Sequence, residues 1–224
     1  MTVHETQLHT AGKPLAEADR ALILLHGRGA TAESILPLGV ALDLPDFAIL
    51  APQAKDFAWY PQRFTAPKEQ NEPFLSSALN TVAGLIKQVE AAGIPRDRIV
   101  LGGFSQGACL ASEFAAQNPT RYGGLLVFSG GLIGAGPTVS TEAYQKAYSG
   151  SLDGTPVFIG CSDVDPHIPL VRVQQTTQIL TSLGASVTEK VYPGMGHTVV
   201  EDELKAARRV LASLTEEANK QADF

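Results

Sequence analysis

Ser105 stands at the centre of a Gly-x-Ser-x-Gly motif, Gly103-Phe104-Ser105-Gln106-Gly107. The apolar, β-branched residues before the motif predict a buried strand, and residues 108–114 have spacing compatible with a helix. A serine on a sharp strand-to-helix turn is held in strained backbone dihedrals with its hydroxyl exposed, and glycine on either side removes Cβ atoms that would collide. The pattern therefore predicts a nucleophile elbow with Ser105 as the nucleophile.

His197 is the candidate base for this serine. A serine hydroxyl is a poor nucleophile near neutral pH, so it needs a histidine to take its proton and a carboxylate to orient that histidine. Where such an elbow is used, the acid and then the histidine follow the serine on loops after later strands. His197 lies after the predicted strand 187–192 and a tight glycine loop that includes Met195, and before a helix predicted from about residue 201.

Two aspartates compete for the role of the acid in the loop after the predicted strand 156–160. We favour Asp165, because it precedes a Pro-x-x-Pro turn that fixes the backbone where the chain enters the next helix. Asp163 remains the alternative, and it would otherwise serve to shape the loop.

An acyl-transfer site also needs donors for the oxyanion of the tetrahedral intermediate, each worth on the order of 3 kcal/mol. We expect the backbone N–H of Gln106, directly after the nucleophile, to be one donor. The backbone N–H of Arg28, in the loop after an early apolar strand, is the expected second donor. His26 lies in the same loop but precedes the serine and has no acid nearby in sequence, so we interpret it as structural.

These motifs together resemble the phospholipase/carboxylesterase family, which includes acyl-protein thioesterases and small bacterial carboxylesterases. The resemblance spans nearly the whole chain and implies an α/β-hydrolase fold, a triad of Ser105, Asp165 and His197, and ester or thioester hydrolysis without a cofactor. The chain departs from many members in having Gly160-Cys161 before the acid loop. The motifs that carry the resemblance are His26-Gly27-x-Gly29, Gly103-Phe104-Ser105-Gln106-Gly107-Ala108, Asp165-Pro166-x-x-Pro169 and Gly194-x-Gly196-His197.

The elements that must position these residues alternate between short apolar strands and amphipathic helices, which predicts an α/β fold with a mostly parallel central sheet and helices on both faces. The active site then belongs at the C-terminal ends of the strands. We expect one domain over residues 1–224, with an edge hairpin near 1–10 and a fraying polar tail at 216–224. Strands are predicted near 22–26, 47–51, 98–104, 124–129, 156–160 and 187–192, and helices near 33–41, 72–92, 106–117, 170–183 and 201–218.

Composition narrows the classes of partner. The net charge of −6 disfavours nucleic acid and anionic lipid, and no apolar run near the N-terminus or later suggests a leader or a membrane span. We therefore expect a cytoplasmic protein without stable membrane association, acting on a small-molecule ester, with a homodimer as an open option. Cys109 and Cys161 are expected to be buried and unpaired. The remaining histidines, His4, His9 and His167, are scattered, so we expect them on the surface or in loops and predict no metal site.

Substrate choice depends on residues 56–73, whose aromatics and prolines suggest a semi-rigid flap over the serine or ordinary loop packing. Candidate pocket residues are Trp59, Arg63, Phe64 and Met195, with the glycine-rich residues 129–137 as a further pocket loop. The arginines at 28 and 63 could hold a substrate carboxylate or phosphate, or could instead be solvated or paired with Asp56, Glu69 or Glu72.

The combined hypothesis is a serine hydrolase that cleaves small to medium carboxylic esters through an acyl-enzyme. Within enzymes, an acyl-protein thioesterase or a lysophospholipase is the alternative. Outside enzymes, the alternative is a ligand-binding module that keeps the hydrolase fold without catalysis.

Overall fold

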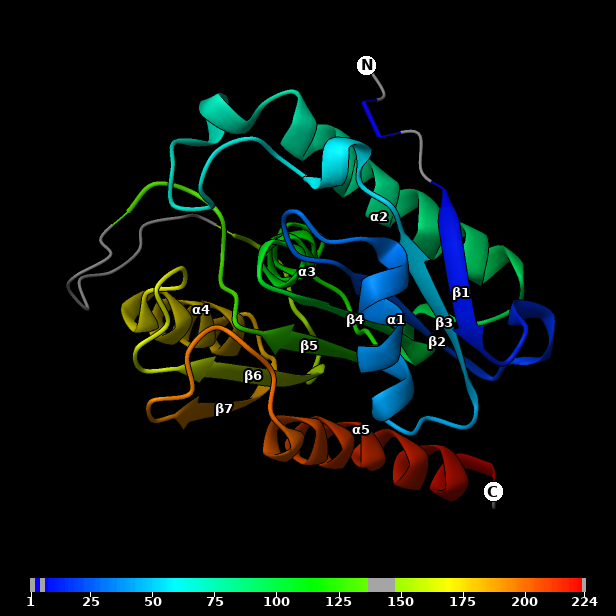
Figure 1. Cartoon of the computed structure of the whole chain (residues 1–224). Helices are drawn as coiled ribbons and strands as arrows, with labels where there is room; N and C mark the ends of the chain where they lie inside the picture. The colour runs from blue at the N-terminus through cyan, green and yellow to red at the C-terminus, as the bar shows by residue number, and fades with distance from the viewer. Residues whose placement is uncertain (1–2, 5–6, 137–147, 223–224) are drawn as a thin grey trace.

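A seven-stranded sheet forms the centre of the molecule (Figure 1). The structure, a computed structural model, describes residues 3–4, 7–136 and 148–222. The strand order is β1-β3-β2-β4-β5-β6-β7, and every pair is parallel except β1 with β3. The strands are β1 (Leu8–Gly12), β2 (Arg20–Leu25), β3 (Phe47–Pro52), β4 (Ile99–Phe104), β5 (Gly124–Phe128), β6 (Pro156–Ser162) and β7 (Ser186–Tyr192).

All six strands predicted from the apolar runs are confirmed, with bounds shifted by at most two residues. The N-terminal prediction was wrong in one respect. β1 is an edge strand, but it pairs antiparallel with β3, about 40 residues later in the chain, instead of forming a local hairpin. Residues 1–2 and 5–6 of the predicted hairpin lie outside the described residues.

Five α-helices cover the two faces of the sheet (Figure 1). α1 and α5 lie on one face, and α2, α3 and α4 lie on the other. The predicted helices are confirmed, except that α5 continues four residues beyond its predicted end, so residues 216–222 of the expected fraying tail are helical. The helices are α1 (Ala32–Ala41), α2 (Phe74–Ala91), α3 (Gln106–Gln117), α4 (Leu170–Ser182) and α5 (Glu201–Ala222).

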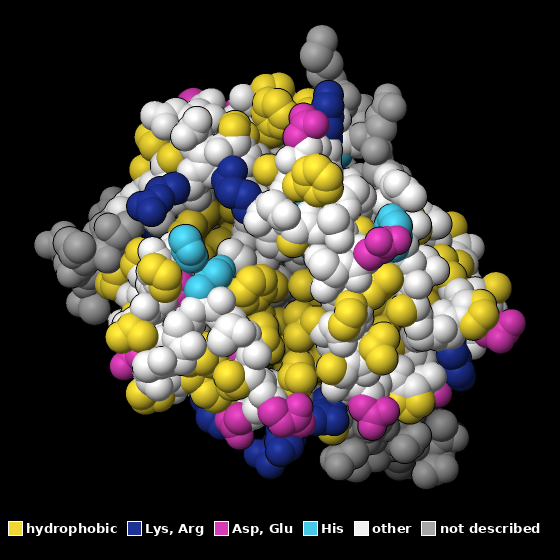
Figure 2. All heavy atoms as spheres, viewed as in Figure 1, with side chains coloured by type: hydrophobic (Ala, Val, Ile, Leu, Met, Phe, Trp, Pro, Cys, Tyr) yellow, Lys and Arg dark blue, Asp and Glu magenta, His cyan; other side chains and the backbone are white. Residues whose placement is uncertain are grey.

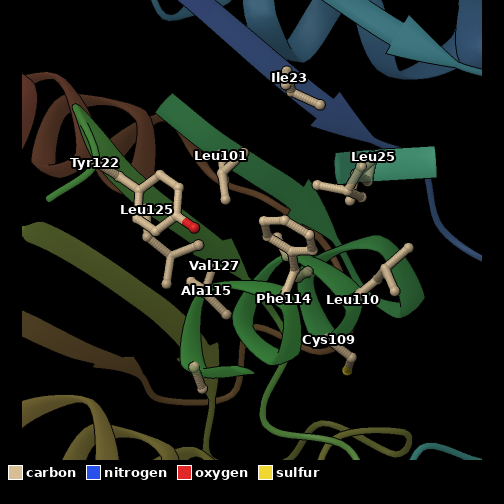
Figure 3. Close-up of a cluster of buried hydrophobic side chains, with 14 of the residues drawn as sticks. Ile23, Leu25, Leu101, Cys109, Leu110, Phe114, Ala115, Tyr122, Leu125 and Val127 are labelled. Atoms are coloured by element: carbon tan, nitrogen blue, oxygen red, sulfur yellow. The ribbon is translucent and has the colours of Figure 1, made fainter. Parts of the chain in front are cut away.

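Each face of the sheet has its own apolar core, because neighbouring residues of a strand point to opposite faces. Leu22 and Leu24 of β2 pack toward α1 and α5, whereas Ile23 and Leu25 pack toward α2 and α3. Figure 3 shows the second of these cores, where Phe114 of α3 points toward the side chains of β2, β4 and β5. Burial on both faces explains why the central strands are continuous apolar runs.

The parallel strands bring the loops that follow β2, β4, β6 and β7 to one edge of the sheet. These loops carry the four sequence motifs described above. In addition, none of the helices in the described part of the chain combines the length and apolarity that a membrane span requires.

Candidate active site

Ser105 occupies the predicted turn between β4 and α3, with φ 55° and ψ −118°. This backbone conformation is rare for a residue with a side chain, and it is the strained turn expected of a nucleophile elbow. The flanking glycines are required by close packing. A Cβ on Gly107 would lie 2.1 Å from the carbonyl oxygen of Leu25, and one on Gly103 would lie 2.5 Å from the backbone carbon of Gly107. The turn therefore brings α3 directly against the end of β2.

A chain of hydrogen bonds joins Ser105, His197 and Asp165. His197 Nε2 lies 2.9 Å from Ser105 Oγ, and His197 Nδ1 lies 2.7 Å from Asp165 Oδ2. The Asp165 side chain is fully buried, and its Oδ1 accepts hydrogen bonds from the backbone N–H groups of His167 and Ile168 at 2.8 and 3.0 Å. Because the carboxylate can only accept, Nδ1 carries the proton and Nε2 is left free to accept from the serine hydroxyl.

The other aspartate of this loop holds the histidine loop in place. Asp163 Oδ1 accepts from the backbone N–H of Gly194 at 2.8 Å, and Ser162 Oγ accepts from that of Gly196 at 3.2 Å. Both glycines have positive φ, which suits a turn that presents two N–H groups to the neighbouring loop. Asp163 therefore contacts the loop that carries His197, and Asp165 contacts His197 itself.

The backbone N–H groups of Arg28 and Gln106 donate to no other group in the described chain. Gln106 is the first residue of α3, where the intrahelical ladder leaves the N–H unpaired and the helix dipole favours negative charge. The Ser105 N–H is engaged, since it donates to the Phe128 carbonyl at 3.0 Å. Both N–H groups that the sequence indicates are thus available at the cavity beside Ser105.

A cavity of about 520 Å³ opens beside Ser105 and His197. Figure 2 shows a hollow on this side of the molecule, with histidine, apolar and Lys or Arg side chains around it. The cavity wall includes the expected Arg63 and Phe64 and their neighbours in the predicted flap segment 56–73, together with three residues that were not predicted to line the pocket. The neighbours are Tyr60, Pro61 and Gln62, and the three others are Phe104, His167 and Ile168.

Residues 59–64 form one wall of this cavity and are fixed by hydrogen bonds from three directions. The Gln106 side chain accepts from Trp59 N and donates to Tyr60 O, at 2.9 and 2.8 Å. The Arg28 guanidinium donates to the carbonyls of Pro61 and Gln62, at 2.8 and 2.6 Å. On the far side, buried Asn71 accepts from Gln62 N and donates to Arg63 O. These hydrogen bonds tie the wall to the first residue of α3, to the loop after β2 and to Asn71.

Two of the pocket candidates lie elsewhere. Trp59 is fully buried, and its indole N–H donates to the His26 carbonyl at 2.9 Å, so the ring packs beneath the wall and does not line the cavity. Met195 is half-buried in the His197 loop and is also absent from the cavity wall. Packing between distant loops turned Trp59 inward.

The glycine-rich loop after β5 was also wrongly expected to line the pocket. Its residues 129–134 are buried between α3 and α4, where a Cβ on Gly130 would lie 2.5 Å from Ala108 Cβ. Glycine is needed here because two helices approach the loop closely. Residue 137 of the predicted loop lies outside the described residues.

The histidines divide between core and site. His26 is buried and structural as predicted, since its Nε2 accepts from Ala54 N and burial lowers its pKa. His4 lies outside the helices and strands, as the prediction allowed, but not at the surface. It is buried against Trp59, and burial lowers its pKa also. His167 lies in a loop as expected, but its ring packs edge-on against His197 with centroids 4.8 Å apart and lines the cavity.

Both cysteines are buried and unpaired, as predicted. Burial raises the pKa of the Cys109 thiol to about 12, and the same is true of Cys161, so neither is a thiolate near neutral pH. Within the described ranges, no group of three His, Cys, Asp or Glu side chains is placed to hold a metal ion.

Comparisons with known proteins bear on the family and the fold. The family model for phospholipases and carboxylesterases (Phospholipase/Carboxylesterase) matches residues 11–215 of this chain. A crystal structure of a phospholipase/carboxylesterase from Dyadobacter fermentans superposes with a TM-score of 0.87 at 42% identity, covering 95% of this chain and 99% of that one. A Bacillus cereus carboxylesterase shares the fold, with a TM-score of 0.72 at 18% identity over 94% of this chain and 95% of the other.

Fungal proteins provide more distant matches. The acyl-protein thioesterase 1 of Saccharomyces cerevisiae is 32% identical over 142 residues, which is 62% of this chain and 59% of the yeast protein. The Gibberella zeae protein of the same name is 36% identical over 120 residues, or 54% of this chain and 49% of that protein. The chain thus spans about half to six-tenths of the length of these relatives. On the match over residues 11–215 and the shared α/β-hydrolase fold, the chain belongs to the phospholipase/carboxylesterase family.

Proposed function

We propose that this protein is a serine hydrolase that cleaves small to medium carboxylic esters through an acyl-enzyme. The observation that carries the proposal is the unbroken hydrogen-bonded chain from Ser105 Oγ through His197 to Asp165, beside two unpaired backbone N–H groups. The nucleophile, the base and the residues that supply the oxyanion donors line one cavity, and the orienting acid lies buried behind His197.

The chemistry follows from this arrangement. His197 Nε2 takes the hydroxyl proton as Ser105 Oγ attacks the ester carbonyl, and the N–H groups of Arg28 and Gln106 hold the resulting oxyanion. The imidazolium then gives its proton to the departing alcohol. A water activated by His197 attacks the acyl-enzyme in the same way and releases the acid. Buried Asp165 stabilises the imidazolium at both steps without taking its proton.

The cavity supports the preference for small to medium esters. About 520 Å³ accommodates a ligand of modest size, and apolar side chains such as Phe64 and Ile168 offer part of the wall to its hydrocarbon groups. An acyl-protein thioesterase is the second candidate, favoured by the identity to the yeast protein of that name. The ratio of kcat/KM for an ester and the thioester of the same acyl group separates the two.

Ser105→Ala tests the central claim. Alanine adopts the strained turn no more and no less easily than serine, so the variant should keep the circular dichroism spectrum and fold of the wild type. Its kcat/KM for p-nitrophenyl butyrate should fall by at least about 10⁴-fold, because the acyl-enzyme cannot form. Turnover within tenfold of the wild type would rule out Ser105 as the nucleophile, and a bound ester that the wild type never hydrolyses would favour a binding module.

A matched pair in one loop tests the acid. Asp165→Asn should lower kcat by about 10³- to 10⁴-fold, because the amide cannot fix the proton on Nδ1 of His197. Asp163→Asn removes the same charge two residues away but touches only the Gly194 backbone, and it should cost less than tenfold. Equal losses in both variants would contradict the assignment of Asp165.

A further inference from the structure

The cavity beside Ser105 is positively charged although the whole chain carries a net charge of −6. The titratable side chains on its wall are Arg28, Arg63, His167, His197, Tyr60 and Cys109, and no Asp or Glu from the described residues lines it. Asp165, the acid nearest the reacting atoms, is fully buried behind His197, where it accepts hydrogen bonds from His197 and two backbone N–H groups, and it does not line the cavity. A substrate entering this cavity therefore meets fixed positive charge.

The two arginines differ in what they are free to do. The guanidinium of Arg28 donates hydrogen bonds to the carbonyls of Pro61 and Gln62 and lies over the Tyr60 ring, 5.9 Å from its centroid. The guanidinium of Arg63 forms no hydrogen bond or ion pair with any described residue. The acids near it in sequence do not neutralise it. Glu72, for instance, accepts from Ser76 N and pairs with Lys68.

The backbone of Arg63 is nevertheless rigidly placed. Its carbonyl accepts from Asn71 Nδ2 at 3.2 Å and from Ala66 N at 3.0 Å, and the next carbonyl, that of Phe64, accepts from Gly134 N at 2.7 Å. Asn71 itself is fully buried. An exposed arginine that lies on a fixed backbone in the wall of a cavity with a reactive serine has the features of a substrate-binding group.

We propose that Arg63 binds a carboxylate carried by the substrate, so that the preferred esters are monoanionic half-esters of dicarboxylic acids or their close analogues. This inference rests on the proposed hydrolytic function and names its substrate class. One free guanidinium matches the single charge and the planar, two-oxygen geometry of a carboxylate, whereas a dianionic phosphate would be only half neutralised. The apolar wall formed by Phe64 and Ile168 accommodates the carbons between the carboxylate and the ester.

The test compares two ester substrates. One is monoethyl adipate, and the other is the same molecule with a primary amide in place of its free carboxylate. The two differ in charge but hardly in size. For the wild type we expect kcat/KM to favour the anionic ester by about tenfold or more, which is the strength of one charge-assisted hydrogen bond. Arg63→Gln should lower this ratio to about one, Arg63→Lys should retain part of it, and raising the salt concentration should weaken it.

Arg98→Gln is the matched control. It removes the same charge from an exposed arginine at the opposite end of β4, so its ratio should equal that of the wild type. A wild-type ratio near one, or a ratio that Arg63→Gln leaves unchanged, would overturn the proposal.

A binding measurement keeps this proposal separable from the hydrolytic function. Calorimetric titration of Ser105→Ala protein with both esters, and of the Ser105→Ala, Arg63→Gln double variant, needs no turnover. Tighter binding of the anionic ester that depends on Arg63 supports the inference even if neither ester is hydrolysed, in which case the proposed function fails alone. If the wild type hydrolyses both esters with equal kcat/KM and the Ser105→Ala protein binds them with equal affinity, the inference about Arg63 is wrong and the proposed hydrolytic function is unaffected.

Discussion

Ser105 is held in a backbone conformation that its own side chain disfavours. The dihedrals of φ 55° and ψ −118° are accessible to glycine, and a residue with a Cβ adopts them at a cost of about 1–3 kcal/mol. The surrounding contacts enforce the turn, since Ser105 N donates to Phe128 O and Cys109 N donates to Ser105 O, both at 3.0 Å. The chain therefore gives up stability to present a hydroxyl.

Replacement by glycine makes this cost measurable. Both Ser105→Gly and Ser105→Ala remove the hydroxyl, but only glycine relieves the strain, and its greater freedom in the unfolded chain offsets part of the gain. We expect Ser105→Gly to be more stable than Ser105→Ala by about 1 kcal/mol in urea unfolding, with both variants inactive. Equal or lower stability of the glycine variant would mean that the turn is not strained.

The residues in and near the cavity show which site residues could be predicted from the local sequence. Ser105, Asp165 and His197 were identifiable because each has a motif whose residue types are dictated locally, by glycine contacts or by a proline turn. Trp59 was misjudged because its surroundings come from other parts of the chain, and the contact of the loop residue His167 with His197 depends on a distant loop that the local sequence does not specify. Trp59 is buried by contacts with Gln106 and His26, which lie 47 and 33 residues away.

At the scale of elements, the predicted strands and helices were reliable because their signals are local and strong. Continuous apolar runs predict strands buried on both faces, and the structure has β2 and β5 buried almost throughout. The pairing of β1 with β3 could not be predicted, because a half-buried edge strand has no pattern that specifies its partner. The role of Asn71 could not be predicted either, because no sequence motif indicates the side-chain hydrogen bonds through which it fixes the cavity wall.

The start of α5 contains a buried acid that ties the helix to the loop carrying His197. Glu203 is fully buried, and its Oε2 accepts from the backbone N–H of Val200 at 2.9 Å. Its Oε1 has no partner and lies over the backbone of Gly160, where a Cβ would come within 2.3 Å of it. Burial raises the pKa of Glu203 from 4.5 to about 7.

This raised pKa predicts a loss of stability as the pH rises. Between the ordinary pKa of 4.5 and the folded value of about 7, the folded protein holds a proton that the unfolded chain has released, so the free energy of unfolding falls with pH through this window. The full effect is of order 3 kcal/mol. Glu203→Gln cannot ionise, so urea unfolding from pH 4.5 to 8 should show a shallower decline than in the wild type. Parallel curves for the two proteins would contradict a raised pKa.

The whole molecule places one of its two edge strands next to the candidate active site. The central strands β4 and β5 are buried and paired on both sides, whereas β7 is mostly half-buried and pairs only with β6. The loop after β7 carries His197 and is attached to the neighbouring loop by the Asp163 and Ser162 hydrogen bonds. Opening β7 breaks one ladder, while opening β4 breaks two and exposes both cores.

Native-state hydrogen exchange should reveal this gradient. We expect amides of residues 99–104 and 124–128 to exchange only through global unfolding, and amides of 186–192 and of the edge strand β1 to exchange faster by local opening. Mass spectrometry of peptic peptides resolves these segments. Covalent phosphonylation of Ser105 supplies oxygens that can accept a hydrogen bond from His197. The label should therefore slow exchange in residues 193–197 and leave exchange in β1 unchanged. Equal slowing at both edges would mean that the label stabilises the sheet as a whole. Protection of β7 equal to that of β4 would show that the histidine is carried on a strand as stable as the core.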